Sequence, residues 1–182
     1  MHFSNDSLIN AIYQNVKKGI QTTFDSECYG SCLILIYCGI DAMSYLDMPQ
    51  QQIEVDKKDF IRWAQNYLSP KLSNEITQIT GEELYNARCA LVHTYGLESR
   101  GTKGGSARII GYMVGGNGPI QYNPRINKSL VMLPLEKLKE AFFKSIDEFL
   151  MKSYADLNKR YVVQTRVETL AKVIHLENIP RS

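Results

Sequence analysis

Apolar residues recur at helical spacing along most of the chain, and this pattern predicts a mainly α-helical protein. The first periodic segment covers residues 6–20, and a second begins at Asp25 or Ser26. The second segment is apolar nearly all round, so we expect it to lie at the centre of the core. A third helix begins at Asp56 and is predicted to end at Pro70, because the residue before a proline disfavours helical backbone.

The fourth predicted helix, residues 82–96, carries most of the candidate chemistry. Thr80 followed by Glu83 has the spacing of a capping box, in which each side chain binds a free backbone N–H at the start of a helix. Gly96 stands where a helix favours a left-handed final residue. The polar residues near the C-terminal end of this helix are Arg88, His93 and Tyr95.

Helical spacing is lost after this helix, and glycine becomes frequent. Seven of the twelve glycines lie in residues 100–118. Residues 107–114 are predicted to form a strand, followed by a glycine-rich turn and a return strand at 120–122. Residues 129–133 are predicted to form a third short strand. We therefore expect a β-hairpin or small meander at about residues 105–133.

A long helix follows this insertion. Pro134 suits the first position of a helix, where its missing N–H is not needed. The apolar stripe then extends to about residue 158, and residues 161–174 form or continue a last helix. Residues 177–182 look like a tail. With 182 residues and no internal repeat, residues 1–182 are predicted to form one domain, a helical bundle with an inserted β-hairpin.

Composition limits the classes of function only mildly. The chain is 44% apolar and 22% charged, which is ordinary for a soluble globular protein. The net charge of +2 argues against a large nucleic-acid surface, but it allows a small basic cleft. The one basic concentration is either a solvated loop or a contact to backbone phosphates. It consists of Arg100, Lys103 and Arg108.

The cysteines and the N-terminal residues indicate an ordinary cytoplasmic protein. The four cysteines lack metal-ligand spacing, so we expect reduced structural thiols and neither a metal nor a cofactor. The N-terminal segment lacks the basic and apolar regions of a signal peptide. The longest apolar run, 32–40, is too short to span a bilayer, so no membrane association is expected.

An arginine and a histidine directed at one cleft suit cleavage of a phosphodiester without a metal. A guanidinium binds phosphate oxygens, and an imidazole exchanges protons near neutral pH. On a straight helix Arg88 and His93 lie about 140° apart around the axis and ~7.5 Å along it, so a compact site needs a second copy of the helix. Asp41, which interrupts the apolar second helix, is either a structural acid or a partner that orients Arg88 or His93.

The pattern Arg88-x4-His93 resembles the motif of the HEPN superfamily of helical domains. The apolar run of residues 29–42, with an acid near its end, is similar to the second helix of many members. With Tyr95 included, the pattern has the R-x4-H-x-Y form of HEPN toxins. The resemblance implies a metal-independent endoribonuclease with Arg88 and His93 as catalytic residues. It also implies a homodimer in which both motifs line one cleft that binds RNA.

The same resemblance implies a biological setting and a further partner. HEPN toxins act in toxin–antitoxin or phage-defence systems, and a nucleotidyltransferase antitoxin can adenylylate the tyrosine, here Tyr95. The alternative is a catalytically inactive HEPN-like module that binds RNA, a nucleotide or a protein partner. Cys89 favours this alternative, because many active members carry a polar residue directly after the arginine. The purely structural interpretation makes Arg88 a salt-bridged residue, His93 a helix cap and Tyr95 a packing ring.

Overall fold

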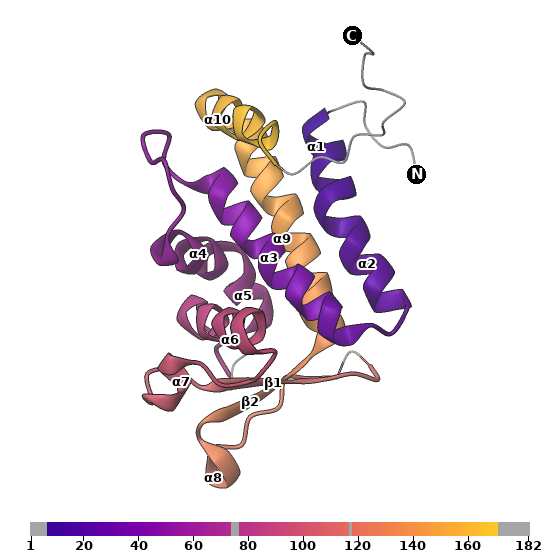
Figure 1. The fold of residues 1–182 in the computed structure, drawn as a ribbon, viewed down its shortest axis with the longest axis vertical. Coiled ribbons are helices and arrows are strands. Elements are labelled where there is room, and N and C mark those ends of the chain that lie inside the picture. Colours follow the sequence, from indigo (N-terminus) through magenta and orange to yellow (C-terminus); the bar gives the residue numbers. More distant parts are fainter. Residues whose placement is uncertain (1–6, 74–76, 117, 171–182) are drawn as a thin grey trace.

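The structure, a computed structural model, is a bundle of helices with a small two-stranded sheet across one end (Figure 1). It describes residues 7–73, 77–116 and 118–170. The mainly helical class is therefore as predicted. In chain order the elements are α1 (Ser7–Ile12), the π-helical turn η1 (Tyr13–Lys17), α2 (Lys18–Asp25), α3 (Tyr29–Asp47), α4 (Lys57–Trp63), the π-helical turn η2 (Ala64–Leu68), α5 (Ser69–Leu72), α6 (Gly81–Thr94), α7 (Arg100–Lys103), β1 (Ile109–Met113), α8 (Pro124–Asn127), β2 (Leu130–Pro134), α9 (Leu135–Ala155) and α10 (Leu157–Val167).

Helix α3 lies at the centre of the bundle, as its uniformly apolar sequence predicted. It contacts α2, α4, α6, α9 and α10, and in Figure 1 it crosses in front of α9. Ile36, Tyr37, Ile40 and Met43 are completely buried. Among the described helices, α3 alone has the length and mean hydropathy of a membrane-spanning helix, and half of that segment is buried inside the protein. Its apolar character is therefore used at least in part to form the core.

The third predicted helix continues past its expected end. Asp56 caps it as predicted, accepting hydrogen bonds from the backbone N–H groups of Lys58 and Asp59. The helix does not stop at Pro70 but runs to Leu72. The preceding turn is π-helical, and the N–H of Ser69 reaches back five residues to the carbonyl of Ala64. This change of hydrogen-bond register lets the helix accept a proline, which lacks an N–H.

The predicted β-hairpin is wrong, although strands form close to the predicted positions. β1 and β2 pair in parallel, with Ile109 opposite Leu130 and Met113 opposite Pro134. The predicted return strand makes only one antiparallel bridge, from Gln121 to Met132 of β2. Residues 114–129 are long enough to carry the chain across the sheet, as a parallel pair requires. The glycine-rich turn therefore does not make the segments before and after it pair as an antiparallel hairpin.

The sheet joins the bundle through the long helix α9. Pro134 is the last residue of β2 and precedes α9, rather than being its first residue. Asp156 separates α9 from α10 because its side chain caps α10, accepting hydrogen bonds from the N–H groups of Asn158 and Lys159. Buried Arg166 of α10 donates to carbonyls at the end of α3, including that of Pro49 at 2.8 Å. The predicted tail of residues 177–182 lies outside the described residues.

Candidate functional site

The guanidinium of Arg88 is paired with the carboxylate of Asp41. Arg88 Nε on α6 lies 3.0 Å from Asp41 Oδ2 on α3, and both side chains are partly exposed. Burial raises the pKa of Asp41, and the charge of Arg88 lowers it only in part. Burial lowers the pKa of Arg88, but Asp41 and Cys89 together raise it more, so the guanidinium stays charged. Of the alternatives left open for Asp41, the structure shows the ion pair with Arg88.

His93 lies in the last turn of α6 and lines an open cavity of about 460 Å³. Cys89 is one helical turn earlier on the same face and lines the cavity as well. The opposite wall belongs to the segment that contains α7, with the carboxylate of Glu98 and two cations. These cations are Arg100 and Lys103, which the sequence already suggested as a basic cluster beside His93.

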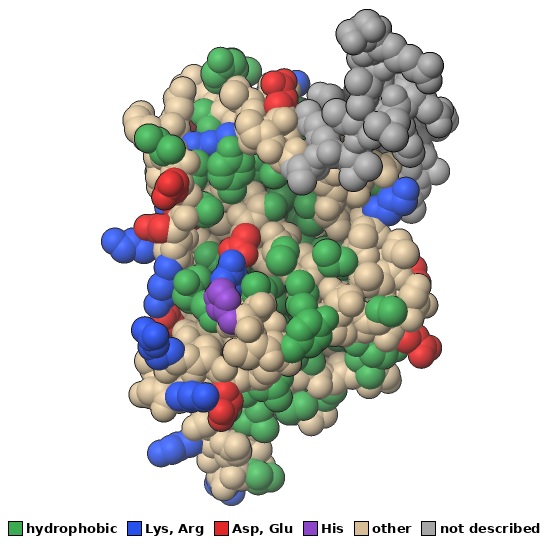
Figure 2. Space-filling model, in the orientation of Figure 1, with side chains coloured by type: hydrophobic (Ala, Val, Ile, Leu, Met, Phe, Trp, Pro, Cys, Tyr) green, Lys and Arg blue, Asp and Glu red, His purple; other side chains and the backbone are tan. Residues whose placement is uncertain are grey.

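Arg88 does not line this cavity, because its side chain turns toward α3. The face drawn in Figure 2 nevertheless carries red, blue and purple atoms that adjoin one another near its middle, with green side chains around them. The ion pair between Arg88 and Asp41 thus belongs to the surface of α3 and α6, while His93 also borders the cavity against α7. Arg88 and His93 therefore point in different directions, as expected for residues five positions apart on one helix.

A buried asparagine fixes the short helix α7 against α6. Asn86 Nδ2 donates to the carbonyl of Glu82, and Asn86 Oδ1 accepts a 2.8 Å hydrogen bond from Ser99 Oγ. Ser99 also caps α7 by binding the N–H of Thr102. Gly101 packs so closely that a Cβ there would lie 2.0 Å from Asn86 Oδ1. This contact sets the position of Arg100 and Lys103 relative to His93.

Sequence reasoning missed this asparagine and its two contacts. Ser99 and Thr102 have the spacing of a capping box, but the usual glutamate or glutamine is replaced by threonine. Asn86 lies in the middle of a helix, where an asparagine gives no signal of its own. Gly101 was counted only as one of several turn glycines.

Tyr95, and not Gly96 as predicted, adopts the left-handed conformation that ends α6. Its φ is 55° and its ψ is 19°, and its N–H binds the carbonyl of Leu91 at 3.0 Å. A left-handed residue with a side chain costs about 1–2 kcal/mol. The ring stays 65% exposed and lies against Gly30, whose added Cβ would come within 3.1 Å of a ring carbon. The tyrosine therefore joins the end of α6 to the start of α3.

The structure does not bring Arg108 to the cavity of His93. Its guanidinium pairs with Glu83 at the opposite end of α6, and it stacks 4.7 Å from the ring centroid of Tyr122. It also donates to the carbonyl of Gln78. Burial raises the pKa of Glu83, but hydrogen bonds from Arg108 and Thr80 lower it more. The basic cluster predicted from sequence is thus divided between two places.

Exposed apolar side chains lie on α3 and just after α6. Leu35 on α3 is 37% exposed, and Leu97, just after Tyr95, is 47% exposed. Cys38, one turn before Asp41, is exposed too. Cys28, just before α3, is also exposed, whereas Cys32 within α3 is buried. The outward face of α3 therefore offers apolar area directly beside a charged pair.

No family model, curated protein or solved structure matches this chain. Within the described part of the chain, no group of three or more histidine, cysteine or acidic side chains is placed to hold a metal ion. The chemistry that the described side chains offer is anion binding and proton transfer. Guanidinium and ammonium groups bind phosphate oxygens, and an exposed imidazole both accepts and donates protons.

Proposed function

We propose that the protein is a metal-independent endoribonuclease of the HEPN type that acts as a homodimer. The observation that carries this proposal is the ion pair of Arg88 with Asp41 beside a cavity that holds His93 and two further cations. A toxin–antitoxin or phage-defence system is the setting that the R-x4-H-x-Y pattern suggests. A HEPN-like fold within the helical class belongs to the same proposal.

The roles of the side chains follow from their chemistry. Asp41 accepts a hydrogen bond from Nε of Arg88, which leaves both terminal nitrogens to bind the non-bridging oxygens of the scissile phosphate. His93 exchanges protons with the reacting oxygens. The 2′-oxygen attacks phosphorus and gives up its proton, while the bond from phosphorus to the 5′-oxygen breaks and that oxygen gains a proton. The products are a 2′,3′-cyclic phosphate and a 5′-hydroxyl.

The exposed apolar surface beside the site supports the dimer. Leu35 and Cys38 leave apolar area uncovered on α3, the helix whose Asp41 holds Arg88. A second copy packed on this face would cover that area and bring a second Arg88 and His93 to the same cleft. This arrangement supplies the compact site that the five-residue spacing denies to one straight helix.

Tyr95 is accessible enough to be modified. Its ring is 65% exposed and does not line the cavity with His93. A nucleotidyltransferase antitoxin that adenylylates this hydroxyl would place a bulky anionic group at the start of α3, where the Tyr95 ring lies against Gly30, and would hinder packing of a second copy there. This partner remains a proposal, because it follows from the resemblance of the motif.

The alternative is a catalytically inactive HEPN-like module that uses the same cavity to bind RNA, a nucleotide or a protein partner. Cys89 favours it, because a thiol lines the cavity directly after Arg88, where many active HEPN proteins have a polar residue. Both functions use Arg100 and Lys103 for anion binding. They differ in whether His93 transfers protons.

The two functions are separated by incubating the purified protein with a mixed RNA in the presence of EDTA. We expect the wild type to cut the RNA and to leave 2′,3′-cyclic phosphate ends, and we expect His93→Ala and Arg88→Ala to be inactive. Arg160→Ala, which removes a cation from α10 away from the site, is the matched control. Intact RNA with the wild type, or equal cleavage by the two site variants, would rule out the nuclease.

The dimer is tested with Leu35→Lys, which places a charge on the exposed face of α3. We expect sedimentation to show a dimer for the wild type and a monomer for the variant, with loss of cleavage and an unchanged helical circular dichroism spectrum. A monomeric wild type that cuts RNA would contradict the requirement for a second copy.

A further inference from the structure

The basic residues of this nearly neutral protein are concentrated in one segment. Residues 99–135 contain no aspartate or glutamate, and the rest of the chain carries 16 basic and 19 acidic residues. This segment forms α7, β1, α8 and β2, which lie together at one end of the molecule (Figure 1). Its five cations are Arg100, Lys103, Arg108, Arg125 and Lys128.

Four of these five cations keep their charge free for a ligand. Arg108 is neutralised by Glu83, but the other four make no ion pair with any described carboxylate. Blue side chains follow the edge of the molecule near α7 and α8 in Figure 2. A local surface of one sign is the charge distribution that attracts a polyanion, even when the net charge of the chain is only +2.

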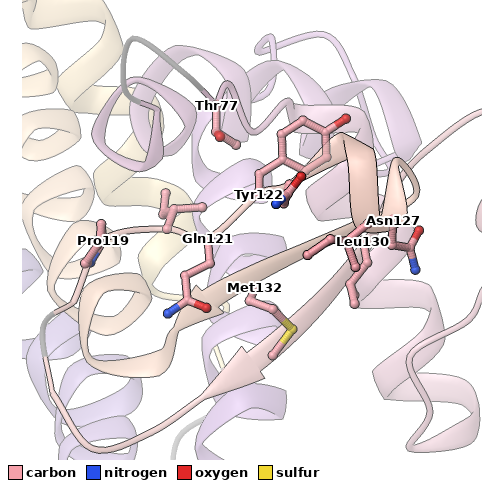
Figure 3. A pocket seen from close by; sticks show the side chains of 10 residues that line it. Thr77, Pro119, Gln121, Tyr122, Asn127, Leu130 and Met132 are labelled. Atoms are coloured by element: carbon pink, nitrogen blue, oxygen red, sulfur yellow. The ribbon is translucent and has the colours of Figure 1, made fainter.

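An apolar groove of about 550 Å³ lies within the same end of the molecule (Figure 3). Its walls are Leu130 and Met132 of β2 and the excursion between the strands, which carries Tyr122. The stack of Arg108 on the Tyr122 ring, together with the pair of Arg108 and Glu83, fastens this wall to α6. The groove is therefore built on fixed elements.

Three of the polar side chains that line the groove are amides. Asn123 Oδ1 and Asn127 Oδ1 accept hydrogen bonds from the backbone N–H groups of Arg125 and Ser129, which leaves their amide nitrogens as donors. Gln121 adds an exposed amide with both a donor and an acceptor. Apolar walls combined with amides suit an unstacked nucleobase, whose faces are apolar and whose edges form hydrogen bonds.

We propose that this basic end binds a single-stranded RNA segment adjacent to the cleaved bond. Arg125 and Lys128 hold phosphates, and the groove takes one unstacked base. This inference rests on the proposed ribonuclease function, because it extends the RNA beyond the cavity of His93. Lys103 and Arg108 are five residues apart, so at most ~18 Å of chain separates the cavity from the groove wall. The absence of acidic residues from the segment favours a polyanion over a peptide.

The phosphate contacts are tested by binding rather than by cleavage. A fluorescent single-stranded RNA of ~12 nucleotides, with every 2′-hydroxyl methylated so that it cannot be cut, is titrated with the full-length protein at several salt concentrations. We expect Arg125→Ala/Lys128→Ala to bind about tenfold more weakly. The slope of log affinity against log salt falls by ~1.4, because each single-strand phosphate contact contributes about 0.7.

The matched control is Lys137→Ala/Lys144→Ala, which removes two cations from α9 and is expected to bind as the wild type does. Equal affinity and equal salt slope for the Arg125 and Lys128 variant would overturn the inference and assign this end to a protein partner. A wild type that cuts RNA while this variant binds normally would overturn the inference alone. Binding that depends on Arg125 and Lys128 in a protein that never cuts RNA would keep it and overturn the nuclease.

The groove is tested with Gln121→Ala and Ile126→Ser, both at exposed positions. Ile126 is 84% exposed, so its replacement leaves the core intact. We expect the two variants to change the order of affinity among methylated U, A, C and G homopolymers, with the salt slope of the wild type. An unchanged order of affinity would overturn the base-binding role of the groove.

Discussion

Asp41 of α3 and Arg88 of α6, 47 positions apart in the chain, meet with 3.0 Å between the carboxylate oxygen and the guanidinium nitrogen. The direction of Arg88 is therefore set by the central helix of the bundle and not by its own helix. Burial raises the pKa of Asp41 even though Arg88 lies beside it. Burial of this carboxylate therefore outweighs the attraction of the guanidinium, a balance that occurs both in functional sites and in structural ion pairs.

Asp41→Asn should separate stability from activity. We expect the free energy of unfolding to change by less than ~1 kcal/mol, because the pair is partly solvated. RNA cleavage should fall by about 100-fold, because a misdirected guanidinium no longer meets the phosphate. Urea unfolding and initial cleavage rates measure the two effects.

Glu82→Gln is the control, since Glu82 also lies on α6 and its exposed ion pair is with Lys57 of α4. It should leave both quantities close to those of the wild type. A large loss of stability in Asp41→Asn, or unchanged cleavage, would make the pair a purely structural contact.

Gly101→Ala should displace α7 from α6. A Cβ at this position would lie 2.0 Å from Asn86 Oδ1, so Asn86 has to release Ser99 or the short helix has to move. We expect a loss of about 2 kcal/mol of stability from overpacking and weaker binding of RNA, because Arg100 and Lys103 move away from His93. Gly118→Ala, where nothing lies within 4 Å of the added atom, should change neither. Normal RNA affinity in the Gly101 variant would separate α7 from the binding site.

Glu83→Gln should destabilise the protein more than changes at the exposed acids. The glutamate is nearly buried, and it binds both Arg108 and the N–H of Thr80. Glutamine can keep the capping contact but not the charge, so we expect a loss of about 2 kcal/mol in the free energy of unfolding. Urea titration of this variant beside Glu82→Gln measures the difference. Equal midpoints for the two variants would show that the pair with Arg108 is not stabilising.

Stability should fall on acidification because of the same glutamate and Asp59. Burial raises the pKa of each, but hydrogen bonds lower it more, from Arg108 and Thr80 for Glu83 and from Asp56 and Gln52 for Asp59. The folded state therefore binds fewer protons than the unfolded one, and the stabilisation present above the ordinary pKa values of 4.5 and 3.8 is lost as pH falls through the lowered ones.

The wild type and Glu83→Gln should therefore converge in stability at acid pH, with the wild type more stable at neutral pH. Asp41 acts in the opposite sense, because its raised pKa makes the folded state bind more protons. Urea midpoints measured across this range test the sign. A constant difference between the two proteins at all pH values would contradict it.

Local signals in the sequence predicted the helices well. The central position of α3 follows from its composition, and the caps at Asp56 and Thr80 follow from residue types at fixed spacing. The strands lie close to their predicted positions, but the way in which they pair was predicted wrongly. Parallel pairing depends on the path of residues 114–129, and this path is set by contacts such as the bridge from Gln121 to Met132 that no local pattern encodes.

The candidate site was also predicted only in part from local sequence signals. Arg88, His93 and the two cations of α7 were found because they are unusual residues close together in the chain. Asp41 was predicted either as a structural acid or as a partner of Arg88 or His93, and only tertiary packing decides between these alternatives. Asn86 was not predicted as a site residue, because its role depends on its contacts with Gly101 and Ser99, which its own position on the helix does not reveal.

The parallel pairing of β1 and β2 also bears on how the protein loses its structure. β2 continues directly into α9, which is packed into the core, whereas β1 is held by contacts with α6, by buried Ile110 and by a hydrogen bond between the hydroxyls of Tyr112 and Tyr37 of α3. A sheet of only two short strands, whose partners are 21 positions apart, is expected to form after the helices and to open early on warming. Heating would then remove RNA capture before the helices melt, so the temperature of inactivation would lie below the melting temperature of the bundle.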